Sequence, residues 1–309
     1  MTAELSSAPS PIVDASPGRP WAAASASVLA YGLIPVVAAF GLAGGASPGV
    51  LVALRGVFAV AAIAVFCAIT GRFRRIPVGA FAGLVLLCGP LYGLQVLAFF
   101  SAVQQGGAQL ATVVTHVYPI LVIVLVSLRD RSPVPWPSSV LAVVVLSGLA
   151  MITMTGGSTA PVGAVGLAFL SATGYALYLV ASERWVHQVG TVLSTVLVTA
   201  GATVAVGGIA LLRGECFTVT TDAWQVALLQ GLVLLPVGLC GALYAIRALG
   251  SVPMSLLGML EPVVGVALAA VLLHERLTLM QGIGAAVILC ACAALPWATQ
   301  PRPRSEGRR

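Results

Sequence analysis

The chain has 309 residues, of which 59% are apolar and 8% are charged, and its formal net charge is +6. A soluble domain carries about 25% charged residues, so this composition excludes a soluble globular protein. The scattered positive charge does not suggest a nucleic-acid partner. The apolar runs are long and continuous, which predicts an all-α integral membrane protein and not a β-barrel.

Residues 1–20 are polar and rich in Pro and Ser, without the basic start of a signal peptide, and we expect a disordered cytoplasmic tail. A membrane span needs about 20 mostly apolar residues. Ten segments meet this condition: 21–40, 49–69, 78–103, 107–128, 138–155, 162–184, 190–212, 223–247, 252–273 and 277–297. Residues 298–309 form a second, basic tail.

All fifteen basic residues are arginine, and their distribution predicts the orientation. With the N-terminus inside, twelve arginines fall on the cytoplasmic side, Arg213 and Arg276 fall outside, and Arg55 lies within a span. We therefore expect both termini in the cytoplasm and the chain in the plasma membrane. Arginine without lysine, among abundant Ala, Gly and Val, is typical of a GC-rich bacterial genome.

The two halves of the chain repeat each other weakly. Shifted by 143 residues, stretch 102–125 lies over 245–268, and Pro119 meets Pro262. Shifted by 144 residues, stretch 27–36 lies over 171–180, and Tyr31 meets Tyr175. Since five is odd, two units of five spans must insert in opposite directions. The expected architecture is ten transmembrane helices in two inverted repeats, residues 21–155 and 162–297, a common build for secondary transporters.

Three short elements near the C-terminus point to a family: Gly250-Ser251, then Glu261-Pro262 inside the next span, then Glu275-Arg276-Leu277 before the last span. Stretch 241–295, which holds them, resembles the end of an EamA-type protein of the drug/metabolite transporter superfamily. Arg55 resembles an arginine common in the second span of that family. The resemblance implies ten spans, two EamA repeats, cytoplasmic termini and transport of small metabolites, usually outward. One departure is that the first half has Tyr118-Pro119 where the second has Glu261-Pro262.

Glu261 is the first candidate for the transport site, because residue count places it near the bilayer midplane. A charge at a helix centre costs roughly 2.5–3.5 kcal/mol on insertion scales, so such a residue faces a cavity or a partner. Pro262 removes a backbone donor and frees the carbonyl of Gly258. Contact with substrate and a purely structural role both remain open for Glu261. The recurrence of Glu-Pro in a family of many substrates favours a scaffold or coupling role.

Arg55 lies six residues inside the outer end of its span. Its stem could reach the headgroups, or its guanidinium could contact an anion or pair with Glu261. The two backbones differ in depth by roughly 5–10 Å, and we expect the pairing.

The remaining candidates are polar side chains deep in the spans. His116 and Tyr118 flank the middle of one span beside Pro119, and we expect His116 to line a cavity. Tyrosines at this depth need a hydroxyl partner. The further candidates for the cavity, paired at helical spacing, are Tyr92, Gln95, Tyr175 and Tyr178. For Tyr31, Tyr244, Gln230, Thr112 and Thr115 we expect ordinary hydrogen bonds between helices.

The leading function is a secondary transporter that exports amino-acid-like or drug-like solutes by alternating access at a midplane cavity. No Gly-x-x-x-x-Gly-Lys motif occurs, so we do not expect ATP to drive transport from within this chain. The alternatives are a facilitative uniporter of the same fold and, less favoured, a membrane-embedded enzyme. We expect no cofactor, no metal and no catalytic residue; the partners are a small-molecule substrate and the lipid bilayer, and a homodimer stays open. If a proton is coupled to export, His116 is the predicted carrier, because a Glu261 paired with Arg55 would stay charged.

Overall fold

The computed structural model of the chain describes residues 18–73, 75–133, 136–153, 161–272 and 279–298, and within these ranges the secondary structure is helical, with no strand. Its elements are α1 (Arg19–Ala43), α2 (Pro48–Ile69), α3 (Val78–Ala82), the π-helix η1 (Gly83–Cys88), α4 (Gly89–Thr115), α5 (Tyr118–Arg129), α6 (Trp136–Thr153), α7 (Val162–Val189), α8 (Thr191–Leu212), α9 (Thr221–Leu229), the π-helix η2 (Gln230–Leu234), α10 (Leu235–Leu249), α11 (Ser251–Gly258), α12 (Glu261–Leu272) and α13 (Leu279–Ala298). The prediction of an all-helical protein is confirmed.

The helices form one apolar bundle. Six helical stretches among the described residues are long and apolar enough to cross a membrane: Arg19–Ala43, Pro48–Ile69, Val78–Gly106, Val162–Val189, Thr191–Leu212 and Thr221–Leu249. Four apolar helices are shorter: Tyr118–Arg129, Trp136–Met151, Ser251–Gly265 and Gly282–Ala291. Large apolar side chains cover the outside, with Leu86 72%, Leu128 71% and Val204 76% exposed. Such a surface is unfavourable in water and suits lipid.

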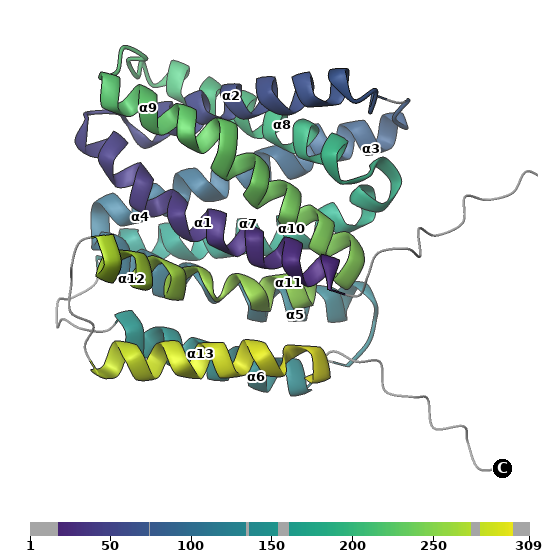
Figure 1. The fold of residues 1–309 in the computed structure, drawn as a ribbon, viewed down its shortest axis with the longest axis vertical. Coiled ribbons are helices and arrows are strands. Elements are labelled where there is room, and N and C mark those ends of the chain that lie inside the picture. Colours follow the sequence, from purple (N-terminus) through teal and green to yellow (C-terminus); the bar gives the residue numbers. More distant parts are fainter. Residues whose placement is uncertain (1–17, 74, 134–135, 154–160, 273–278, 299–309) are drawn as a thin grey trace, which may run out of the picture.

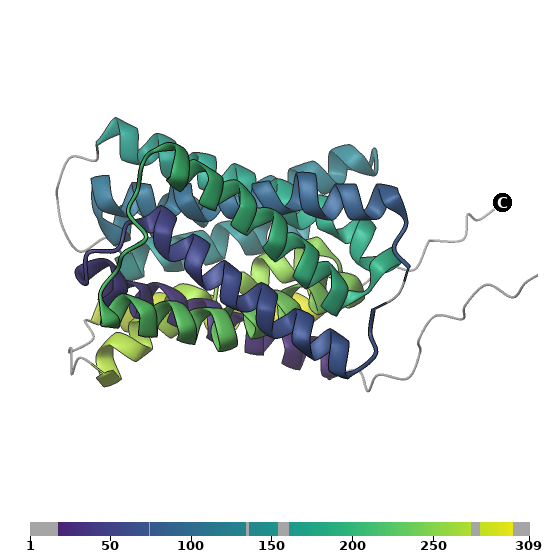
Figure 2. The ribbon, with the colours of Figure 1, turned by 90° about the horizontal axis from the view of Figure 1, so that it is seen from above.

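The helices pack side by side and extend from one end of the bundle toward the other in both views (Figures 1 and 2). α6 and α13 pack against each other along one edge, where Val145 and Leu149 meet Ile288. Gly148 permits this contact, because a Cβ there would lie 2.9 Å from the Gly284 carbonyl oxygen. The larger core lies on the other side of α5 and α11, among α4, α7, α8 and α10.

Single glycines make the sharpest connections. Gly190 joins α7 to α8 with φ +85°, and Gly250 joins α10 to α11 with φ +93°. Residues with a Cβ rarely adopt this conformation. The Gly190 N–H still donates to the Val186 carbonyl, and the Gly250 N–H to the Ile246 carbonyl, both at 2.9 Å. Each helix therefore keeps its last hydrogen bond and the chain turns at the glycine.

The break expected at residues 104–107 has no counterpart in the backbone hydrogen bonds, since α4 continues to Thr115. The direction of the chain nevertheless changes there. Ser171 donates to Gln95 at 3.2 Å, Gly106 lies against Ala164, and Thr115 donates to the Ala168 carbonyl at 3.3 Å. A straight helix antiparallel to α7 would carry Thr115 past the start of α7. The chain therefore turns back near residue 107, where the fourth span was expected to begin, although the helix assignment runs through this point.

The two ends of the bundle differ in charge. At one end, which we call the arginine-rich end, α2, α5, α7 and α10 finish (Figure 1). The described arginines at or near it are Arg19, Arg72, Arg75, Arg129, Arg131, Arg184 and Arg247. At the opposite end Arg213 lies in the connection from α8 to α9, which is held to the turn between α1 and α2 by a hydrogen bond from Thr220 to the Gly44 carbonyl (2.9 Å).

An ion pair ties three helices together at the arginine-rich end. Arg129 at the end of α5 binds Glu183 of α7 at 2.8 Å, and Ser251 of α11 donates to the same carboxylate at 3.0 Å. Arg129 also binds its neighbour Asp130 at 2.8 Å, and this hydrogen bond lowers the pKa of the Asp130 carboxyl. Half-exposed pairs of this kind contribute little to stability. Their structural role is to connect α5, α7 and α11.

Candidate functional site

Two helices are interrupted at equivalent points of the two halves. α5 begins at Tyr118 and α12 begins at Glu261, which is 143 residues later. Before each start lies a turn in which an N–H bonds a carbonyl only three residues back: Val117 to Val114 at 3.3 Å and Leu260 to Leu257 at 3.0 Å. Both helical spans are thus interrupted just before Pro119 and Pro262.

The prolines explain why the helices break at these points. Pro119 and Pro262 are each the second residue of the new helix, where a missing N–H removes no helical bond. Neither can donate to the carbonyl four residues earlier, which is Thr115 in the first half and Gly258 in the second. Each break therefore leaves polar backbone groups in the middle of an apolar helix pair.

The two breaks lie against each other. The Tyr118 hydroxyl donates to the Ser255 carbonyl of α11 at 3.0 Å. Gly258 faces both residues that begin the new helices, since a Cβ there would lie 2.0 Å from the Tyr118 hydroxyl and 3.5 Å from Oε1 of Glu261. Tyr118 and Glu261 occupy equivalent positions of the two halves but differ in residue type, and both lie against the same glycine.

A row of aromatic side chains runs from this contact through the bundle, and we call it the tyrosine array. Ring centroids lie 5.9 Å apart for His116–Tyr118, 4.7 Å for Tyr118–Tyr175, 6.0 Å for Tyr175–Tyr178 and 5.2 Å for Tyr178–Tyr92. The Tyr92 hydroxyl lies 3.5 Å from that of Tyr31. The array draws on α1, α4, α5, α7 and the turn after α4.

Several buried polar atoms along the array have no hydrogen-bond partner in the described chain. They are Nε2 of His116, the Tyr178 hydroxyl and Oε1 of Glu261. His116 is held in place through its other ring nitrogen, 2.8 Å from the Thr112 carbonyl. Buried polar groups in proteins are almost always bonded, so these three atoms mark where a polar ligand would be bound most favourably.

Arg55 stands at the other end of the array and does not pair with Glu261, contrary to our expectation. Its guanidinium donates to Gln230 at 3.0 Å, and Gln230 donates to the Ile34 carbonyl at 3.2 Å. Both side chains are buried, Arg55 at 2% and Gln230 at 0% exposed.

The structure thus gathers most of the predicted site and adds to it. His116, Tyr118, Tyr92, Tyr175 and Tyr178 form the array, with Glu261 beside it. Gln95 is instead used in packing α4 on α7, through Ser171 and against Gly174. The Glu275-Arg276-Leu277 element lies outside the described residues.

Two members were missed as site residues. Tyr31 was expected only to bond another helix, although the repeat already matched it with Tyr175. Gln230 opens the π-helix η2, an irregularity that is frequent at functional sites; its one signal in the sequence is an amide within an apolar run.

The first prediction concerns the contact at Gly258. A Gly258→Ala methyl would overlap the Tyr118 hydroxyl, whose ring is buried against Tyr175. We expect a loss of stability of about 1–3 kcal/mol, as for other overpacked cores, measured as a lower melting temperature in detergent. Gly166→Ala is the control, because a Cβ there meets nothing within 4 Å. Adding Tyr118→Phe should recover part of the loss; a fully stable Gly258→Ala variant would contradict the contact.

The second prediction concerns the partner of Arg55. Double-mutant cycles on thermal stability should give a coupling of about 0.5–3 kcal/mol for Arg55→Leu with Gln230→Leu, as for residues in contact. The cycle of Arg55→Leu with Glu261→Leu should give a smaller value, because the two side chains form no ion pair in the described structure. A larger coupling for Arg55 with Glu261 than for Arg55 with Gln230 would show that Arg55 pairs with Glu261.

Comparison with known proteins identifies the fold. Residues 21–154 and 162–295 each match the EamA-like transporter family. A solved structure described only as "Crystal structure of protein" superposes with a TM-score of 0.74 at 18% identity, over 91% of this chain and 99% of that one. At that identity it shows a shared fold alone. The comparison with curated proteins gives no match. Because the family model covers both halves, the chain belongs to the EamA-like transporter family.

Proposed function

We propose that the protein is a secondary transporter that exports small polar solutes, amino-acid-like or drug-like, by alternating access at the tyrosine array. The family consists of transporters. The observation that carries the proposal is the set of unpartnered polar atoms on His116, Tyr178 and Glu261 beside two interrupted helices. Broken helices at half depth are typical of substrate sites in transporters.

We further propose ten membrane crossings in two inverted repeats of five. The six long and four shorter apolar helices supply the segments, and the reversal near residue 107 separates the third crossing from the fourth. The equal offset of α5 and α12 supports the repeat. We place the arginine-rich end and both termini in the cytoplasm of a bacterium, by the positive-inside rule.

Contacts between the two repeats are those that a rocking motion has to change. The Tyr118 bond to the Ser255 carbonyl joins α5 to α11 at the array. The Arg129–Glu183–Ser251 cluster joins α5 to α7 and α11 at the arginine-rich end. Under this proposal the cluster closes the cytoplasmic side in the present conformation, and it would open when the site turns inward.

Glu261 gives the site a chemical preference. A carboxylate with a free oxygen in a water-poor surrounding binds a protonated amine strongly, because the low dielectric increases the attraction. Tyrosine hydroxyls and the His116 imidazole can hold neutral polar groups. The candidate substrates are therefore amines that also carry hydrogen-bonding groups, which includes amino acids and many toxic compounds.

The absence of an Arg55–Glu261 pair also changes the expectation for energy coupling. His116 was favoured as a proton carrier because Glu261 was expected to be locked. With Arg55 bonded to Gln230, Glu261 is free to exchange a proton, and we propose that proton entry through Glu261 drives export. A facilitative uniporter is the alternative. Among the described residues no group of His, Cys, Asp or Glu could hold a metal ion, and nothing here favours an enzyme.

The third prediction tests Glu261 in transport. In proteoliposomes screened with the twenty radiolabelled amino acids, the wild-type protein should show saturable counterflow for at least one. Glu261→Gln should reconstitute equally and lower that rate at least about tenfold, equivalent to about 1.4 kcal/mol in the barrier. Asp222→Asn, an exposed carboxylate at the start of α9, is the control and should transport normally.

Imposing a pH gradient on the same vesicles separates the two modes of coupling. Acceleration of wild-type flux that is lost in Glu261→Gln and kept in His116→Gln supports coupling through Glu261. If the pH gradient does not change the flux in the wild type, in Glu261→Gln or in His116→Gln, the protein is a uniporter.

The fourth prediction tests orientation. Alkaline phosphatase is active only outside the cytoplasm, so a fusion after Arg309 should be inactive and a fusion within the α8–α9 connection, after residue 217, should be active. Fusions to a cytoplasm-dependent fluorescent protein should give the opposite result at both positions. The opposite pattern for either fusion pair would overturn the proposed orientation.

A further inference from the structure

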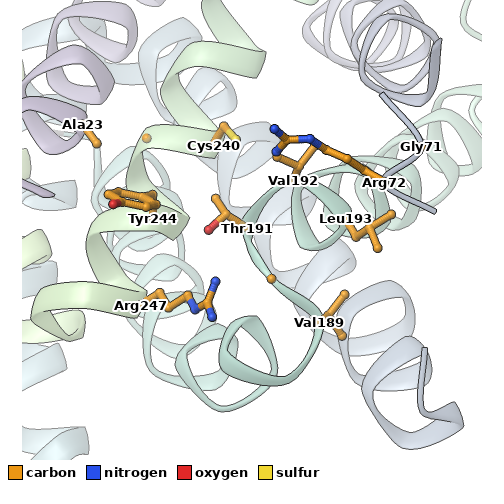
Figure 3. A pocket seen from close by; sticks show the side chains of 12 residues that line it. Ala23, Gly71, Arg72, Val189, Thr191, Val192, Leu193, Cys240, Tyr244 and Arg247 are labelled. Atoms are coloured by element: carbon orange, nitrogen blue, oxygen red, sulfur yellow. The ribbon is translucent and has the colours of Figure 1, made fainter. Parts of the chain in front are cut away.

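A cavity lies at the arginine-rich end, away from the tyrosine array. It has a volume of about 640 Å³ and lies between the first part of α1, the connection after α2, the α7–α8 turn and α10 (Figure 3). Its polar lining comes from Arg72, Arg247, Tyr244, Thr191 and Cys240. None of these residues takes part in the array.

The charge of this pocket is positive and uncompensated. The lining includes two arginines and no acidic residue. Arg72 and Arg247 approach the start of α8 from different sides, with Thr191 between them (Figure 3). Both ion pairs found among the described residues are made by Arg129, so neither pocket arginine has a carboxylate partner there.

The backbone adds donors at the same place. α8 is 22 residues long, and its cap, Gly190, has no side chain to bond the first turn. Ser194 is the first residue whose N–H bonds back to Gly190, at 3.1 Å. The N–H groups of Thr191, Val192 and Leu193 therefore have no helical acceptor, and all three residues line the pocket. The Thr191 hydroxyl is also buried without a partner.

We propose that this pocket binds a phosphate group. Two guanidinium groups and the positive end of a long helix form a site for a compact anion with several acceptor oxygens. The volume leaves room for the rest of a phosphate-bearing molecule. Basic pockets between membrane helices on the cytoplasmic side hold lipid headgroups in other proteins. The phosphate could belong to an anionic lipid or to a soluble compound, and the chemistry of recognition is the same.

The inference does not depend on the proposed transport function, and it can be tested without a transport substrate. The fifth prediction is that a phosphate-bearing ligand raises the melting temperature of the full chain in detergent, because it binds only the folded protein. Phosphatidylglycerol in mixed micelles is compared with phosphatidylcholine, and sodium phosphate with sodium chloride at equal ionic strength. Arg72→Gln or Arg247→Gln should weaken the apparent affinity about fivefold, as expected for loss of one charged contact at a partly exposed site. Arg184→Gln, an exposed arginine of α7 outside the pocket, should leave it unchanged.

Cys240 gives a local readout in the same samples. It lines the pocket, whereas Cys216 is exposed in the α8–α9 connection at the opposite end. Ligand binding should slow maleimide labelling of Cys240 and leave Cys216 unaffected, as followed by peptide mass spectrometry. Protection by phosphatidylglycerol alone identifies a lipid site, and protection by sodium phosphate as well identifies a site open to soluble phosphates. Equal labelling in all four conditions, or stabilisation that persists in both pocket variants, would overturn the proposal.

Discussion

The structure depends on one constraint: a helix interrupted inside a bilayer must find partners for its broken backbone within the protein. Pro119 and Pro262 lie just after the interruptions between α4 and α5 and between α11 and α12, and neither break could face lipid. The breaks therefore turn toward each other, and Tyr118 donates to a carbonyl of the opposite repeat. The polar side chains of the tyrosine array collect around this contact because the same constraint applies to their hydroxyls.

The repeat supplies two similar backbones, and its chemistry comes from where the copies differ. Tyr118 uses its hydroxyl to hold α11, whereas Glu261, at the equivalent position, keeps one buried oxygen without a partner. A symmetric pair of tyrosines would remove the carboxyl group from this contact. A symmetric pair of carboxylates would place two charges at one glycine, Gly258, which is costly in a low dielectric. One of each gives a tyrosine hydroxyl that bonds the backbone and a single carboxyl group with an unpartnered oxygen.

Sequence reasoning predicted the helices, because they follow from counting residues along apolar runs. Counting residues along a span gives only the expected depth of a side chain in the membrane. It placed Arg55 and Glu261 at similar depth but could not tell their directions around the bundle, and Arg55 turned out to face Gln230. Residues one helical turn apart, such as Tyr92 and Gln95, were both expected at the site, yet Gln95 packs on α7.

The two polar sites share a pair of helices that could connect them. On α1, Tyr31 belongs to the array and Ala23 lines the pocket; on α10, Gly238 lies against the Tyr31 ring and Arg247 reaches the pocket. The helices are closely packed between these points, where Ser27 donates to the Gly238 carbonyl at 2.7 Å. A motion that separates α1 from α10 at the array must therefore also change the pocket. An anion bound there would favour whichever conformation holds it more tightly, and its effect on transport could be no larger than that difference in affinity.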